Sequence, residues 1–338
     1  MVAIAIIRMK DLFAIVMLSG IYGLLSACFF VAMDAVDVAF TEAAVGAGIS
    51  TLLMLVVITM TGRHENKTRH KPLSALFVVI ITGGLLIYGT FDIPLFGSAD
   101  APIHHHVSPR YINDSAAEIG VPNIVTSVLA SYRAFDTFGE VVVIFTAGIG
   151  VLALLAVVRR PEDESEIDSI NDSMHEQHLI IRIVAKILIP FILLFALYVQ
   201  FHGDFGPGGG FQAGVIFAAA IILYTMLFGL STARKVINQP FIQLIAALGV
   251  LLYGCVGIAS LLNGGNFFDY NVLASTPIGG QHLGILLIEW GVGCTVASVM
   301  ILIFFNFGGR REMQQQKTTQ HKAMQTKAKQ DSQIQEFL

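Results

Sequence analysis

Residues 12–32 read LFAIVMLSGIYGLLSACFFVA and contain no charged side chain. A helix rises about 1.5 Å per residue, so this run forms a rod of about 30 Å, which matches the hydrocarbon core of a bilayer. Within lipid, only helices and closed barrels satisfy every backbone hydrogen bond, and this run lacks the alternation of a barrel strand. It therefore predicts a membrane-spanning helix.

Seven further apolar runs have a similar length and character. They are residues 38–60, 73–91, 140–158, 179–199, 211–230, 241–262 and 283–307. The composition agrees, because 55% of the residues are hydrophobic and 13% are charged, against roughly 25% charged in soluble domains. A soluble globular fold is excluded, and we predict an all-α, polytopic membrane protein with about eight transmembrane helices.

The positive charges between the spans are distributed unevenly. If the N-terminus is cytoplasmic, nearly all Lys and Arg residues fall on the cytoplasmic side, and Arg110 and Arg133 are the exceptions. Short loops rich in Lys and Arg remain in the cytoplasm, so this asymmetry predicts the orientation and supports the count of eight spans. We expect both the N-terminus and the C-terminus to be cytoplasmic.

One long hydrophilic stretch, residues 159–178, separates four spans from four spans. It is either the fusion point of two smaller membrane proteins or an ordinary cytoplasmic loop, and the composition is compatible with both. The tail at 308–338 is rich in Gln, Lys and Thr and poor in apolar residues, which predicts disorder or a solvated helix.

Carboxylates stand inside several of the apolar segments. An ionised acid in hydrocarbon costs about 2.5 to 3.5 kcal/mol even on lenient insertion scales, so such residues usually line an ion or proton path. Asp37 either caps the second span or belongs to such a path. Glu42 is followed by AAVGAG at 43–48, whose small side chains let another backbone approach and permit a 3₁₀ or π distortion. We predict a path role for Glu42.

Asp136 and Glu140 lie four residues apart, so their carboxylates can come within about 6 Å of each other on a helix. At an effective dielectric constant of about 20, the repulsion is about 3 kcal/mol, and one acid stays protonated unless a cation lies beside the pair. The pair could share a proton or hold a sodium ion transiently. The alternative is that Asp136 caps the helix and only Glu140 is buried.

Three further titratable residues are candidates for the path. Glu289 lies in the eighth span among small residues, as a path residue or as a hydrogen-bonded structural acid. His202 and Asp204 belong to the turn FHGDFGPGGGF at 201–211, at the rim of the membrane. The turn lacks the Gly-Lys-Ser/Thr ending of a phosphate loop. Because no activated nucleophile, metal-ligand spacing or cofactor fingerprint is present, we predict a transporter component without catalytic residues, cofactor or resident metal.

Three sequence stretches resemble one known family. DVAFTEAAVGAG at 37–48 and YRAFDTFGE at 132–140 resemble the two C-terminal modules of the large A subunit of Mrp-type sodium/proton antiporters. HGDFGPGGGFQAG at 202–214 resembles the signature of the B subunit. Together the matches cover most of residues 11–307.

The resemblance implies a division of the chain. Residues 1–160 would form a four-helix module similar to the C-terminal region of the A subunit, and residues 179–307 a four-helix module similar to the B subunit. Residues 161–178 would be the cytoplasmic linker at the fusion point, followed at the end by the polar cytoplasmic tail, 308–338.

The resemblance also implies a function. The chain would be a membrane subunit of a multisubunit cation/proton antiporter of the bacterial cytoplasmic membrane, related to membrane-bound hydrogenases and to complex I. The acids that match Glu42 and Glu140 are implicated in ion passage in that family. The implied partners are other antiporter subunits, including proton-pumping antiporter-like subunits, together with lipid, H⁺ and Na⁺ but no nucleic acid.

Two alternatives remain for the function of the chain. It could be a structural assembly subunit, or a membrane-arm subunit of a redox-driven ion pump such as a membrane-bound hydrogenase. The large antiporter-like part of the A subunit is absent, and the helix before the first span is reduced to residues 1–10. We therefore expect that this chain does not transport ions alone.

Overall fold

The computed structural model describes residues 1–65, 72–95, 97–155 and 179–336, with the backbone alone from residue 311 onward. Within these ranges the regular structure is helical and contains no strand, which confirms the all-α prediction. The proposed linker at 161–178 lies outside the described residues.

Eight helical segments among the described residues are long and apolar enough to cross a membrane. They are α2 (Leu12–Ala32), the continuous second span of α3 (Val36–Glu42), η1 (Ala43–Ile49) and α4 (Ser50–Thr61), then α5 (Pro72–Thr90), α10 (Ala134–Leu155), α12 (Leu179–His202), α13 (Gly210–Phe228), α15 (Gln239–Leu262) and α16 (Pro277–Glu336). The predicted number of spans is confirmed. The fourth span begins at Ala134 rather than at 140, so Asp136 lies in its first turn.

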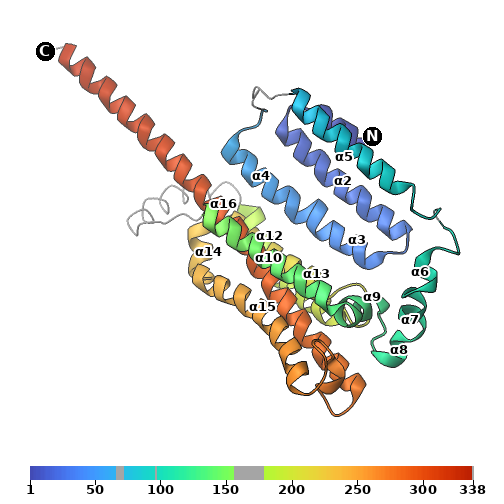
Figure 1. Ribbon diagram of the computed structural model, residues 1–338. Coiled ribbons are helices and arrows are strands. Elements are labelled where there is room, and N and C mark those ends of the chain that lie inside the picture. The colour runs from blue at the N-terminus through green and yellow to red at the C-terminus, as the bar shows by residue number, and fades with distance from the viewer. Residues whose placement is uncertain (66–71, 96, 156–178, 337–338) are drawn as a thin grey trace.

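Shorter helices occupy the ends of the chain and the connections. They are α1 (Val2–Arg8), α6 (Pro102–His105), α7 (Ser108–Asn113), α8 (Ser115–Glu118), α9 (Ile124–Thr126), η2 (Ser127–Tyr132), α14 (Leu230–Val236) and η4 (Tyr270–Val272). Figure 1 shows α6 to α9 as a series of short turns that leads from α5 toward α10.

The best-buried part of the molecule surrounds α16. This helix packs against α10, α13 and α15, and its Ile285, Val296 and Phe305 are fully buried. Beyond this bundle, α16 continues as a helix to Glu336, so the described part of the tail is helical. In contrast, α5 buries none of its residues within the described chain. The apolar side chains of α5 are therefore exposed on the outside of the described chain.

Asp11 joins the first two spans at one end. Its carboxylate caps α2 by accepting the backbone N–H of Phe13 at 3.0 Å and forms a salt bridge of 2.8 Å with Arg63, which follows α4. The Arg63 guanidinium lowers the pKa of Asp11 below its usual range. The start of α2 and the end of α4 are therefore held on the same side of the membrane.

Candidate functional site

The glycine-rich turn between α12 and α13 is held by the segment before η2. Asn123 donates its side-chain N–H groups to the carbonyl oxygens of Gly203 at 3.2 Å and Gly206 at 3.0 Å. Thr126 donates its hydroxyl to Gly203 at 2.6 Å. These bonds satisfy backbone groups that no helix pairs, and they tie the turn of the second half to the first half of the chain.

The turn packs directly over Glu289 of α16. Gly209 has a φ of +104°, which favours glycine, and a Cβ placed there would lie 2.9 Å from Oε1 of Glu289. A Cβ on Gly203 would lie 3.2 Å from the same oxygen. Glycine is favoured at Gly209 by its positive φ, and at Gly203 because a Cβ would also lie 2.8 Å from the backbone of Gly209.

A cavity of about 330 Å³ lies beneath this turn, and three carboxylates line it. They are Asp37 of α3, Glu140 of α10 and Glu289 of α16, from three different helices and both halves of the chain. Carboxylates in an apolar span are costly and usually line an ion or proton path. The cavity brings together three groups that can bind and release protons.

Polar contacts join the two halves of the chain along one wall of the cavity. Asp37 accepts the backbone N–H of Gly208 at 3.3 Å. Gln212 donates its amide to the hydroxyl of Thr41 at 3.0 Å, and Thr41 donates to the carbonyl oxygen of Asp37 at 3.0 Å. The start of the second span is thus fixed against the start of α13.

A histidine and an aspartate meet at the rim of the turn. Nδ1 of His282 lies 3.7 Å from Oδ2 of Asp204. Partial burial raises the pKa of Asp204, and the neighbouring His282 opposes that rise. His282 was not among the residues predicted from the sequence, although its seven-residue spacing from Glu289, about two helical turns, places both residues on one face of a helix.

Glu42 does not reach the cavity. Its carboxylate lies between α2 and η1, next to Gly46 and 3.1 Å from the position that a Cβ on Gly23 would take. The two glycines leave the space that this side chain fills. Glu42 therefore belongs to the contact between the first two spans.

Asp136 and His202 also lie apart from the three cavity carboxylates. Asp136 is exposed and forms a salt bridge with Arg133, so a cation does lie beside it. His202 stacks on Tyr198 with ring centroids 5.0 Å apart. Of the seven residues predicted for the path, three line the cavity, and Asp204 lies in the glycine-rich turn beside His282.

The predicted burial of the carboxylates was wrong for the described chain. Asp37, Glu42, Glu289 and Asp204 are partly exposed, while Asp136 and Glu140 are exposed. The reason is that the spans of the first half pack loosely, so the cavity remains open at its side. An acid within an apolar run can face an uncovered side of its helix as well as the interior.

A π-helix adjoins each of two helices that carry predicted path residues, α3 with Glu42 and α10 with Glu140. η1 follows Glu42 directly and confirms the predicted distortion at 43–48. η2 precedes the helix that carries Glu140 and was not predicted. Tyr270 and Tyr253 donate their hydroxyls to the carbonyl oxygens of Ala130 at 3.0 Å and Ala134 at 2.9 Å. These tyrosines lie more than a hundred residues away, so no local pattern shows them.

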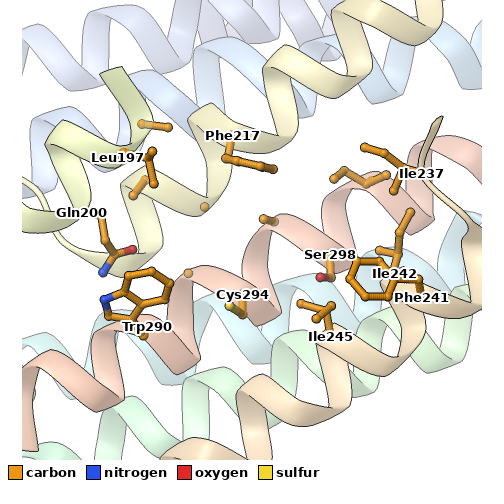
Figure 2. Close-up of a pocket in the computed structure, with 16 residues that line it drawn as sticks. Leu197, Gln200, Phe217, Ile237, Phe241, Ile242, Ile245, Trp290, Cys294 and Ser298 are labelled. Atoms are coloured by element: carbon orange, nitrogen blue, oxygen red, sulfur yellow. The ribbon is translucent and has the colours of Figure 1, made fainter. Parts of the chain in front are cut away.

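A second, apolar groove of about 370 Å³ runs along the other side of α16. Figure 2 shows Gln200 and Trp290 at one end and Ile237 and Phe241 at the other, with Cys294 between them. No Asp, Glu, Lys or Arg is among its described lining residues. Its lining is predominantly apolar, with Gln200 and Ser298 among its few polar side chains.

Comparison with known proteins identifies the family. Residues 180–302 match the family described as "Domain related to MnhB subunit of Na+/H+ antiporter". The chain is 30% identical to "Putative antiporter subunit mnhB2" of Staphylococcus aureus (strain Newman), over 41% of this chain and 99% of that protein. The chain belongs to the Mrp-type multisubunit antiporter family. Residues 1–63 and 74–172 match the families of the MBH D and E subunits, respectively.

A longer Mrp-type relative contains both halves in one chain. It is a probable K(+)/H(+) antiporter A/B subunit of Rhizobium meliloti (strain 1021), 25% identical over 88% of this chain and 32% of that protein. This arrangement agrees with a fusion of the C-terminal region of an A subunit to a B subunit. Our chain spans about a third of the length of that relative.

Two solved structures of related complexes have a similar fold. The Mrp complex from Dietzia sp. DQ12-45-1b matches with a TM-score of 0.69 at 24% identity, over 91% of this chain and 33% of that chain. The membrane-bound sulfane sulfur reductase, an archaeal respiratory membrane complex, matches with a TM-score of 0.51 at 27% identity, over 70% of this chain and 98% of that chain.

Proposed function

We propose that this chain is a membrane subunit of a multisubunit cation/proton antiporter, and that Asp37, Glu140 and Glu289 form part of its proton or sodium path. One observation carries the proposal: these carboxylates come from three helices and converge on one cavity beneath a glycine-rich turn. Intramembrane acids that share a cavity usually serve ion passage rather than stability.

Protons or a sodium ion would pass between the carboxylates of the cavity. Glu140 and Glu289 lie on helices that pack against each other, and both side chains line the cavity. Thr41 and Gln212 supply neutral polar atoms on the opposite wall. Since the cavity is open at its side, neighbouring subunits would cover it and exclude lipid.

Glu42 would act at the interface between the first two spans, and Asp136 with Arg133 at the outer end of α10. The wider assignment follows the family. Other antiporter subunits, including proton-pumping ones, would cover the apolar faces of helices such as α5, together with lipid. The modules would be 1–160 and 179–307, joined at 161–178, in the bacterial cytoplasmic membrane with both termini cytoplasmic.

Charge removal in the cavity tests this function in the assembled complex. Glu140→Gln and Glu289→Gln should each lower cation-dependent proton exchange in membrane vesicles by about a hundredfold or more, because the variants cannot release a proton. Glu65→Gln is the matched control, since Glu65 is exposed beyond the end of α4. Unchanged exchange in both cavity variants, with the complex intact on native gels, would refute the path role.

The same variants separate the path from the assembly alternative. If the acids only hold the subunits together, Glu140→Gln and Glu289→Gln should dissociate the complex on native gels. Intact complexes with lost exchange support the path.

A redox-driven pump is the second candidate, favoured by the match to a respiratory membrane complex. The cavity would then carry ions moved by electron transfer in other subunits. Purification of the complex decides between the two candidates. Antiporter-like subunits without iron–sulfur absorption support the antiporter, and iron–sulfur subunits support the pump.

A further inference from the structure

We propose that His282 and Asp204 form the mouth through which protons reach Glu289 from the side of the membrane that holds the glycine-rich turn. This inference rests on the proposed function and adds an entry point to it. His282 then acts as a positioning and proton-collecting residue of the path.

The side chains of this proposed entry become less exposed from His282 to Asp204. The side chain of His282 is 40% exposed and that of Asp204 is 23% exposed, with Nδ1 and Oδ2 3.7 Å apart. Glu289 lies deeper, among the residues that line the cavity. The three groups therefore lead from the wet surface to the carboxylates.

The fold places Asp204 between the other two groups. His282 and Glu289 lie on one face of α16, seven residues or about 10 Å apart along the axis. Asp204 directly follows Gly203, whose Cβ position is 3.2 Å from Glu289 Oε1. The backbone N–H of Asn123 donates to the carbonyl oxygen of Asp204 at 3.0 Å, which holds the residue at this point of the turn.

The chemistry of each group suits its position. An imidazole exchanges protons with water near neutral pH. A proton leaves Nδ1 of the His282 imidazolium and binds Oδ2 of Asp204, so one N–H bond breaks and one O–H bond forms. Nδ1 and Oδ2 lie 3.7 Å apart, so a small movement of either side chain brings them to hydrogen-bond distance for this transfer. The neutral imidazole then takes its next proton from bulk water, and Asp204 passes its proton on to Glu289.

Other titratable groups on neighbouring elements are engaged elsewhere. Glu118 of α8 accepts from Arg110 and from the hydroxyl of Tyr132. These bonds lower the pKa of Glu118, while burial raises the pKa of Tyr132 to about 12. His202 stacks on Tyr198. The mouth is therefore assigned to the His282–Asp204 pair.

Neutral variants of the mouth test this inference in the assembled complex in vesicles. We expect His282→Gln and Asp204→Asn each to slow proton exchange at least tenfold and to change its pH profile, because each variant lacks a group that can bind and release a proton. Because the residues act in series, the double variant should be no slower than the slower single variant. His106→Gln is the matched control, since His106 is exposed and far along the chain from the turn.

Each outcome decides the inference. Normal exchange with a normal pH profile in His282→Gln overturns it, and so do additive losses in the double variant. If His282→Gln prevents assembly on native gels, His282→Asn and Asp204→Asn provide the same comparison. Retained exchange in Glu140→Gln and Glu289→Gln would refute the path itself, whereas their loss together with normal His282→Gln exchange would refute only the mouth.

Discussion

Single residues control how closely the turn approaches Glu289. Gly209 combines a positive φ with a Cβ position 2.9 Å from the carboxylate, so a side chain there would strain the backbone and shift the end of the Glu289 side chain. The glycine-rich sequence of this turn indicated that it bends tightly. It could not indicate that the glycines face an acid about eighty residues away.

Replacement of Gly209 tests the contact. Gly209→Ala should lower the free energy of unfolding by about 1 to 3 kcal/mol through backbone strain and should also reduce exchange, because the methyl group displaces Glu289. Thermal unfolding and vesicle exchange measure the two effects. Gly264→Ala is the control, since Gly264 has a φ of +85° with open space around it.

The two variants should differ in function and not only in stability. Gly264→Ala should be destabilised without loss of exchange. Equal exchange in both variants would show that the contact between the turn and Glu289 has no role.

At the scale of elements, hydropathy predicted the helices well because the bilayer thickness fixes their length. The π-helix η1 followed from the small residues after Glu42, which pack closely and tolerate a wider turn. The π-helix η2 did not, since the carbonyl oxygen of Ala130 in η2 accepts from Tyr270 of a distant segment. A local pattern cannot encode a hydrogen bond that only packing creates.

Removal of the tyrosine hydroxyls tests the support of η2 and of the start of α10. Tyr270→Phe removes the bond to Ala130 and Tyr253→Phe the bond to Ala134, and each loss should cost about 0.5 to 1.5 kcal/mol of stability and loosen the start of the helix that carries Glu140. Thermal unfolding and exchange rates measure this loss. Tyr88→Phe on α5 is the control, because Tyr88 is exposed, and an equal loss there would contradict the assignment.

At the scale of the whole molecule, the two halves meet through specific contacts. Gln212 binds Thr41, Gly208 binds Asp37, and Tyr253 binds Ala134. These pairs lie far apart in the sequence, so the contact between the two halves is made by tertiary packing.

Separate expression of the halves tests this arrangement. Residues 1–160 and 179–338, produced together as two chains, should purify as one complex and restore exchange, because the interface does not require a peptide link. Co-purification and vesicle assays measure the result. Halves that remain apart would show that the fusion is necessary for assembly.

The sequence by itself determined the helical fold, the number of spans and the family, because apolar length and short motifs are local properties. Only the tertiary structure decided that Asp37, Glu140 and Glu289 line one cavity. It also decided that Glu42 lies against α2 and that Asp136 forms a salt bridge with Arg133. The physical reason is that the face of a helix that meets a neighbour depends on packing between distant segments, and charge spacing along one helix does not reveal it.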